Sequence, residues 1–224
     1  PLVASLLEDL SVEGKQFHAL WSSSLVDSTT LAMPDTEAVD FSTRASGVDR
    51  IFNSSTKPLI FDGDTGGLIE HFPFMVKSLE RLGVSAVIIE DKTGLKKNSL
   101  FGTDVVQHLA DPHDFADKIK AGLAVRSNPD FLVIARLESL VLGRSVEDAL
   151  DRSRIYIDAG LDGIMIHDKK NDPSDVFDFC KRFRANGYAH PLVVVPSSYN
   201  QVYESELESL GVNVVIYANQ LLRA

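Results

Sequence analysis

Cysteine is nearly missing from this sequence, and long hydrophobic runs are missing altogether. The one cysteine, Cys180, excludes an internal disulfide framework and a cysteine-rich zinc site, which suits a reducing compartment. No apolar stretch approaches the roughly 18 residues that a membrane helix needs, and the sequence opens without a signal-like segment. We therefore expect a soluble, cytoplasmic protein that is not bound to a membrane.

Clusters of basic residues are also missing from the sequence. Its 22 lysines and arginines are outnumbered by 32 aspartates and glutamates, which gives a formal net charge of −10. Nucleic acid is therefore not an expected partner, and a small anionic substrate would need a locally positive site. The 224 residues, 44% of them hydrophobic, suffice for one sizeable core. With no linker in sight, we expect a single domain over residues 1–224, which could belong to a longer polypeptide.

Short apolar runs alternate with longer amphipathic segments. The runs are rich in Val and Ile, as expected of strands that are buried on both faces. We predict strands over His18–Ser22, Leu59–Asp62, Ala86–Glu90, Phe131–Arg136, Gly163–His167, Leu192–Val195 and Val212–Tyr217. We predict helices over Phe72–Leu82, Phe115–Arg126, Val146–Ala159, Ser174–Asn186 and Glu204–Leu210. This alternation predicts a parallel sheet with right-handed crossovers.

Two architectures are compatible with such a sheet: an open, doubly wound sheet and a closed, parallel (β/α) barrel of the TIM type. Nearly every run ends in a polar group, and these groups are Ser23, Asp62 with Asp64, Glu90 with Asp91, Arg136 with Glu138, His167, Ser197 and Asn219. Catalytic groups at the ends of many strands are typical of a barrel, whereas a doubly wound sheet gathers them at one switch point. We predict the barrel. Because seven runs are visible and the first residues look helical, we expect the first strand to lie upstream.

Carboxylates follow two neighbouring strands. Asp62 and Asp64 come just after one strand, and Glu90 ends the next. Carboxylates that converge on one mouth repel each other unless a cation lies among them, and oxygen ligands suit Mg²⁺. The three together predict a magnesium site, although either aspartate alone could simply cap a helix or bond the turn.

The segment Lys92–Gly102 is polar and has a glycine near each end. It carries Lys96 and Asn98, so it could fold over a phosphate and exclude water, or it could be a solvated basic loop.

Arg136 lies in the run Leu-Val-Ile-Ala-Arg-Leu-Glu, where an arginine is costly unless it is paired or faces an anion. Its planar fork suits phosphate oxygens, but a structural salt bridge to Glu138 or Glu90 is the alternative. His167 ends the next run. It could be a core histidine, or it could donate to the same phosphoryl group.

Two further segments are ambiguous from their residues alone. Ser22-Ser23-Ser24-Leu25 follows Trp21 and could offer backbone N–H groups to a carboxylate, or it could be a serine-rich turn. Asp35 could be the N-cap of the next helix.

Assembled, these residues resemble the phosphoenolpyruvate mutase branch of the isocitrate lyase superfamily, essentially from end to end. The matching motifs are Trp21-x-Ser23-x-Leu25, Asp62-x-Asp64-Thr65-Gly66, Glu90-Asp91-Lys92 with Asn98-Ser99, Ala135-Arg136-x-Glu138, His167-x-Lys169-Lys170, Asp172-Pro173-Ser174, and Ala218-Asn219 with Leu222-Arg223-Ala224. The Glu-Asp-Lys segment followed by Asn-Ser is the most specific of them, since it marks the mobile lid of mutases. Ser22 and Ser24 stand where this family usually has glycines.

The resemblance implies a role for each position. Asp62 would be the principal Mg²⁺ ligand, with Asp64 and Glu90 holding metal-bound waters. Arg136, His167, Lys96 and Asn98 would surround the phosphoryl group, next to Ser99 in the lid. The substrate carboxylate would lie on the backbone of Ser23, Ser24 and Leu25, with Trp21 lining the pocket and Asp35 near the transferred group.

The activity that the resemblance implies is an isomerase reaction, the interconversion of phosphoenolpyruvate and phosphonopyruvate in phosphonate biosynthesis. It also implies C-terminal helices that exchange between subunits, which are absent here, and a homo-oligomer, either a dimer or a tetramer. Because formation of a carbon–phosphorus bond is usually uphill, we expect a fused or partner enzyme that consumes phosphonopyruvate.

Three rival functions stay open. A phosphonopyruvate hydrolase would share the barrel, but the resemblance assigns the Asn98-Ser99 spacing to mutases. A carbon–carbon lyase of the isocitrate lyase type would carry a catalytic cysteine in its lid, whereas Cys180 lies in a predicted helix. The third rival is a catalytically inactive barrel that serves as a binding module.

Overall fold

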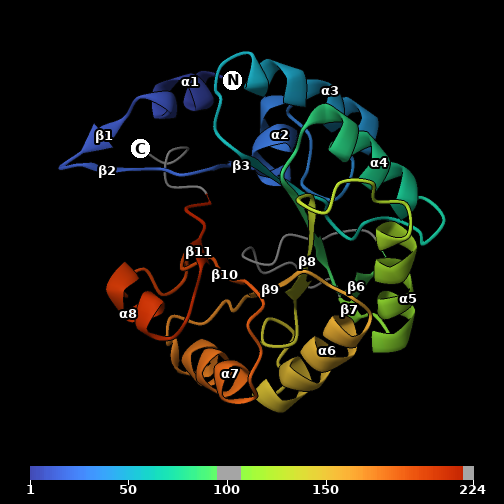
Figure 1. The fold of residues 1–224 in the computed structure, drawn as a ribbon, viewed down its shortest axis with the longest axis vertical. Coiled ribbons are helices and arrows are strands. Elements are labelled where there is room, and N and C mark those ends of the chain that lie inside the picture. The colour runs from blue at the N-terminus through green and yellow to red at the C-terminus, as the bar shows by residue number, and fades with distance from the viewer. Residues whose placement is uncertain (95–106, 219–224) are drawn as a thin grey trace.

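A parallel sheet of seven strands forms the centre of the computed structural model, which describes residues 1–94 and 107–218 (Figure 1). The strand order is β11-β10-β9-β8-β5-β4-β3, so each strand is added on the same side of the one before it. A doubly wound sheet would instead reverse direction at a switch point. The strands are β3 (Leu20–Ser22), β4 (Leu59–Asp62), β5 (Ala86–Glu90), β8 (Leu132–Leu137), β9 (Gly163–Ile166), β10 (Leu192–Val194) and β11 (Val214–Val215).

Helices lie around the outside of the curled sheet, as the ring of ribbons in Figure 1 shows. The described helices are α1 (Leu2–Glu8), α2 (Ser24–Thr30), α3 (Phe41–Phe52), α4 (Phe72–Leu82), α5 (Pro112–Leu123), α6 (Val146–Asp158), α7 (Ser174–Ala185) and α8 (Glu204–Ser209), and α2 is set inside the ring (Figure 1). The remaining strands of the described residues form two small antiparallel pairs. They are β1 (Ser11–Val12) with β2 (Lys15–Gln16), and β6 (Lys92–Thr93) with β7 (His108–Leu109). None of the described helices is both long and apolar enough to cross a membrane.

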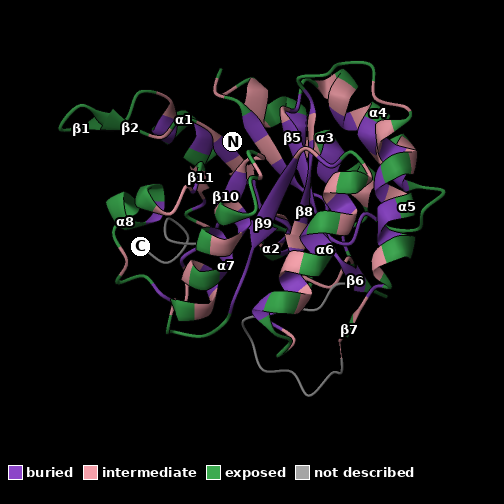
Figure 2. Ribbon diagram, turned by 60° about the horizontal axis from the view of Figure 1, so that its bottom comes forward, coloured by how far each residue is buried: buried purple, intermediate pink, exposed green. Residues whose placement is uncertain are grey.

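Local sequence explains where several helices begin and end. The carboxylates of Asp40 and Asp111 accept backbone N–H groups at the starts of α3 and α5, and the hydroxyl of Ser145 does the same at α6. Gly83 ends α4 with a φ of 85°, a left-handed conformation that glycine adopts without the strain a Cβ would cause. Solvent meets the outer faces of these helices while the strands are buried, as Figure 2 shows.

The two faces of the sheet pack into separate cores. The outer core joins strand residues such as Val87 and Ile89 to the helices, through side chains that include Val76 and Phe115. The buried residues of the inner core all come from strands or the residues just after them, and they are Ala86, Ile88, Ile134, Met165, Val193, Val195 and Ile216. Because successive side chains in a strand point to opposite faces, the even-numbered residues of β5 face inward and the odd-numbered ones meet the helices.

The predicted parallel barrel is confirmed, as a curled half-barrel of seven strands with helices on its outer face, and every predicted strand is present. Helices α2 and α3 and both antiparallel pairs escaped prediction. Helix α2 is rich in serine and threonine, and α3 has a glycine in its middle, so both lack a strong helical signal. Among the described residues β3 and β11 stand at the two ends of the sheet, and the upstream first strand and the C-terminal helices stay predictions.

Candidate active site

Four of the predicted site residues continue the inner face of the sheet. Asp62, Glu90, Arg136 and His167 each stand two residues after an inward-facing residue, and those residues are Ile60, Ile88, Ile134 and Met165. The register pairs Glu90 with Arg136, Asp62 with Ile88 and Arg136 with Met165. The four side chains therefore gather at the carboxyl ends of four neighbouring strands, inside the barrel.

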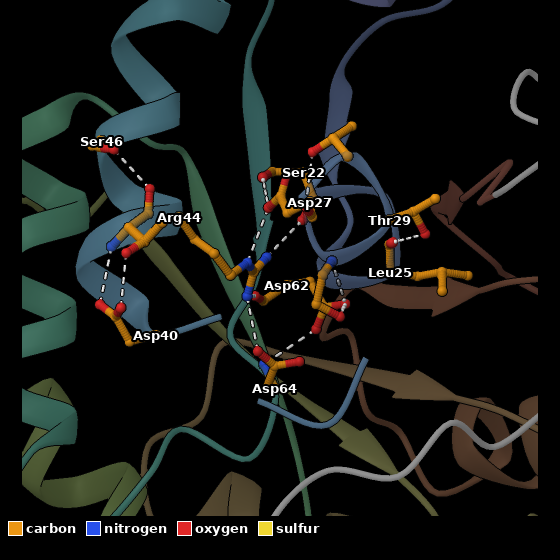
Figure 3. Close-up of polar contacts among 12 residues, drawn as sticks. Ser22, Leu25, Asp27, Thr29, Asp40, Arg44, Ser46, Asp62 and Asp64 are labelled. Carbon is orange, nitrogen blue, oxygen red and sulfur yellow. Dashed lines mark hydrogen bonds and ion pairs between the residues drawn. The ribbon is translucent and has the colours of Figure 1, made fainter. Parts of the chain in front are cut away.

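Asp62 is buried and accepts hydrogen bonds from the first residue of α2 and from its own loop (Figure 3). Its Oδ2 atom accepts the backbone N–H of Ser24 at 3.2 Å and the Ser24 hydroxyl at 2.8 Å. Its Oδ1 atom accepts the N–H of Asp64 at 3.1 Å. The Ser24 hydroxyl thus adds a contact that a glycine at this position could not make.

The turn after Asp62 has an unusual backbone. Asp64 has a φ of 53°, in the left-handed region that costs most residues about 1 kcal/mol but that aspartate tolerates better. Its carbonyl accepts the N–H of Glu90 at 2.7 Å, which joins the turn to the end of β5. Backbone conformations of this kind cluster at functional sites, and the Asp64 carboxylate accepts a hydrogen bond from Arg44 Nη1 at 2.9 Å.

Arg44, from α3, connects the ends of β3 and β4 (Figure 3). Its Nη1 atom donates to the Asp64 carboxylate at 2.9 Å and to the carbonyl of Asp62 at 2.6 Å. Its Nε atom donates to the Asp27 carboxylate at 2.9 Å, and its guanidinium stacks over the ring of Phe61. Burial alone would lower the Arg44 pKa, but Asp64, Asp62 and Asp27 outweigh that effect and raise it, so the side chain stays charged.

A buried cluster of ion pairs surrounds Glu90. Lys92 Nζ lies 2.8 Å from Glu90 and 3.3 Å from Glu138, while Arg136 lies 2.9 Å from Glu90 and 2.5 Å from Glu138. Burial would raise the Glu138 pKa, but the two cations outweigh it and lower that pKa. The salt bridge considered for Arg136 is therefore present, with both Glu90 and Glu138.

Asp91, the neighbour of Glu90, points the other way. It is buried in the outer layer, where it accepts hydrogen bonds from the Glu138 N–H at 2.8 Å and from the Tyr156 hydroxyl at 2.9 Å, and it pairs with Arg152 at 3.3 Å. Burial raises its pKa to about 7, against the opposing effect of these donors. Asp91 therefore belongs to the packing of α6 on the sheet.

The segment that carries Asp35 is joined by hydrogen bonds to residues 62–67, which we call the metal turn after the magnesium ion predicted there. Asp40 caps α3, so the alternative role of Asp35 as a helix cap does not hold. Two residues after Asp35, the Glu37 carboxylate accepts the Thr65 hydroxyl at 2.8 Å and its N–H at 3.3 Å. From α5, Lys118 donates to the carbonyls of Thr65 and Gly67 at 2.9 and 2.7 Å. Thr65 is thus held from both sides.

The remaining predicted residues fall into two groups. Trp21 packs against the inner core, and Ser23 and Leu25 lie at the start of α2, with Ser23 as its N-cap. Lys96, Asn98 and Ser99 lie outside the described residues, so their roles stay predictions. Within the part described, the predicted lid segment begins with β6, where the Lys92 side chain is buried rather than solvated.

The donor set suits Mg²⁺. Asp62, Asp64 and Glu90 are buried carboxylates at one end of the barrel, and Mg²⁺ takes one or two carboxylates while keeping several waters. Across residues 1–94 and 107–218, no three His, Cys, Asp or Glu side chains lie close enough to form a ready cage of direct ligands. These residues fit a hydrated magnesium ion better than a zinc-type site.

Sequence reasoning missed the residues that hold the site from other elements, which are Glu37, Arg44 and Lys118. One signal was available for Arg44. It lies three residues after Phe41 and four before Val48, so a charged residue occupies the buried face of α3. A buried arginine needs anionic partners, and the nearby unassigned carboxylates were the candidates.

Cys180 is fully buried in α7, within the outer core, and burial raises the pKa of its thiol to about 12. We expect a thiol reagent at pH 8 to label the folded protein about a thousandfold more slowly than the urea-unfolded protein, since the thiolate is the reactive form. Ellman's reagent measures both rates. Labelling at equal rates would contradict this burial and would reopen the lyase alternative with its reactive cysteine.

The sequence of this chain matches one protein-family model and several characterised enzymes. The family model described as phosphoenolpyruvate phosphomutase matches residues 3–224. A phosphonopyruvate hydrolase of Variovorax sp. (strain Pal2) is 37% identical over 226 residues, covering 100% of this chain and 75% of the relative. A phosphoenolpyruvate phosphomutase of Tetrahymena pyriformis is 35% identical over 215 residues, covering 95% of this chain and 70% of the relative.

The fold agrees with a solved relative. The crystal structure of a phosphonopyruvate hydrolase in complex with oxalate and Mg²⁺ superposes with a TM-score of 0.87 at 34% identity, covering 100% of this chain and 74% of the other. These matches support an enzyme with a divalent metal cofactor and a small-molecule substrate. The chain belongs to the phosphoenolpyruvate phosphomutase family, within the isocitrate lyase/PEP mutase superfamily.

Proposed function

We propose that this chain is a Mg²⁺-dependent phosphoenolpyruvate mutase, which interconverts phosphoenolpyruvate and phosphonopyruvate. The observation that carries the proposal is the inward alignment of Asp62, Glu90, Arg136 and His167 at the ends of adjacent strands. Two carboxylates for a cation lie beside an arginine and a histidine that suit an anion. This combination fits a substrate that carries both a carboxylate and a phosphoryl group.

In this proposal each residue has a defined task. Asp62 is the principal holder of Mg²⁺, with Asp64 and Glu90 around it, and the ion supplies positive charge to the oxygen atoms of the substrate. Arg136 and His167 stabilise the charge that spreads over the phosphoryl oxygens as the group leaves oxygen. The pyruvate enolate then presents its carbon to phosphorus, so positioning and the exclusion of water decide the outcome.

The buried cluster around Glu90 prepares the site for this chemistry. Lys92 and Arg136 hold Glu90 and Glu138 in fixed positions, and the Arg136 side chain is only 12% exposed. Charges held in a largely dry environment act more strongly on a substrate than charges in water. Little reorganisation would then be needed when the phosphoryl group moves.

Phosphonopyruvate hydrolase is the second candidate, because the Variovorax hydrolase resembles this chain as closely as the mutases do. The Asn98-Ser99 pair, eight residues after Glu90, supports the mutase through the resemblance described above. We therefore expect closure of the segment around Asn98 to exclude water. A mutase would also act together with an enzyme that consumes phosphonopyruvate.

Phosphorus NMR distinguishes the two activities directly. The full chain is mixed with phosphonopyruvate and Mg²⁺, and the spectrum is followed over time. Phosphoenolpyruvate should appear as the product, at a rate that depends on Mg²⁺. If inorganic phosphate appears instead, the hydrolase is correct, and if neither forms, the inactive-barrel alternative gains support.

Replacing Asn98 with alanine should lower the mutase rate about a hundredfold, because a misplaced or open lid loses the positioning of the phosphoryl group. The same NMR assay measures the rate, and the ratio of phosphoenolpyruvate to phosphate measures water entry. Asn128→Ala, outside the proposed site, serves as the control. Full activity in N98A would refute the role of this residue.

A further inference from the structure

Arg44 makes the two aspartates of the metal turn chemically unequal. Its guanidinium pairs with the Asp64 carboxylate at 2.9 Å but touches Asp62 through the backbone carbonyl, at 2.6 Å (Figure 3). The Asp62 carboxylate accepts the Ser24 hydroxyl and the N–H groups of Ser24 and Asp64, and the charges of Arg44 and Arg136 also act on it. A carboxylate that shares its charge with a guanidinium is a weaker ligand for a metal than one bonded to neutral donors.

Asp27 competes for the same cation. Its Oδ2 atom accepts Arg44 Nε at 2.9 Å, and its side chain is 30% exposed, whereas the Arg44 side chain is 3% exposed. Asp27 lies on α2, outside the metal turn. Its ion pair with Arg44 therefore weakens the attraction between Arg44 and Asp64, although Asp27 does not bind the metal itself. Asp27, Arg44 and Asp64 form a row in which one buried cation makes an ion pair with each of two carboxylates.

We propose that Arg44 is a positioning residue that sets the metal preference of this site, by restraining Asp64 from binding the cation directly. The inference rests on the proposed magnesium site. With Asp64 restrained, the site offers few direct carboxylates, which favours Mg²⁺ because this ion keeps its waters. Release of Asp64 would supply the additional direct oxygen ligands that Ca²⁺ accepts in its larger and more flexible shell.

Two substitutions with different expected effects on metal binding test the proposal. Arg44→Met removes the cation and releases Asp64, so the affinity for Ca²⁺ should rise about tenfold relative to that for Mg²⁺. Asp27→Asn leaves the charge of Arg44 to Asp64 alone, so both ions should bind about threefold more weakly. Asp40→Asn is the control, since it removes an acid from the start of α3, and asparagine caps a helix equally well.

Isothermal titration of the full chain with MgCl₂ and with CaCl₂ gives both affinities without any substrate. Water-proton relaxation with bound Mn²⁺ reports the waters on the ion, and R44M should have fewer than wild type. Circular dichroism checks that each variant is folded. The D40N variant should match wild type in all three measurements.

The outcomes separate this inference from the proposed function. If wild-type protein binds neither ion, the proposed metal site itself fails. If wild type binds Mg²⁺ but folded R44M keeps the wild-type preference, Arg44 is only structural and the inference is overturned. If R44M does not fold, D27N decides, and affinities equal to those of D40N would refute the inference.

Discussion

Replacement of Asp62 with asparagine is expected to lower Mg²⁺-dependent turnover about a thousandfold, since a principal metal ligand contributes several kcal/mol to the transition state. The substitution preserves the shape of the side chain but removes its charge. It also places an amide where Ser24 now donates two hydrogen bonds, at 3.2 and 2.8 Å, so one oxygen acceptor is lost. Phosphorus NMR measures the rate, and titration calorimetry measures the loss of Mg²⁺ binding.

The control for this experiment is Asp117→Asn, which makes the same chemical change at an exposed position on α5, where Asp117 pairs with Lys120. That variant should retain wild-type turnover and metal binding. A D62N protein that still binds Mg²⁺ as wild type does would show that the cation lies elsewhere, and the assignment of Asp64 and Glu90 would fail with it.

Replacement of Lys92 with methionine is expected to destabilise the fold by about 3–5 kcal/mol, the usual cost of breaking a buried ion pair. The cluster now contains two cations, Lys92 and Arg136, and two carboxylates, Glu90 and Glu138. Without Lys92 one negative charge is left uncompensated among side chains that are at most 12% exposed. Urea denaturation followed by circular dichroism gives the free energy of unfolding.

Lys120→Met is the matched control. Lys120 and its partner Asp117 have side chains that are 58% and 61% exposed, and exposed pairs contribute about 0–1 kcal/mol. The double variant Lys92→Met/Glu138→Gln restores neutrality and should recover part of the loss, which a double-mutant cycle quantifies. Equal losses in K92M and K120M would mean that the cluster around Glu90 is not a buried network.

Sequence patterns were sufficient for the strands and for the inward residues at their ends. A strand buried on both faces leaves a compact apolar run, and its alternation fixes which of two neighbours faces inward. The pattern therefore placed Glu90 and Arg136 at one mouth, where the register pairs them. The same alternation separates Glu90 from Asp91, although both were first considered as parts of one acidic group.

Residues that act across elements could not be predicted in this way. The contacts of Arg44 with Asp64 and of Glu37 with Thr65 join segments that are 20 and 28 residues apart. Such contacts depend on how α3 and the preceding loop pack against the sheet, which local periodicity does not encode. The electrostatic argument for the metal was incomplete for the same reason, since Arg44, Arg136 and Lys92 already offset part of the acidic charge.

The separation of the two cores has a practical consequence for enzyme engineering. Side chains such as Ile88, Ile134 and Met165 form the floor beneath the site and belong to strands, while the helices contribute to the other core. A library that varies floor residues in size would change the depth of the substrate space and leave the helical shell intact. Activity could then be redesigned with little penalty to the scaffold, provided that the total volume of the floor is conserved.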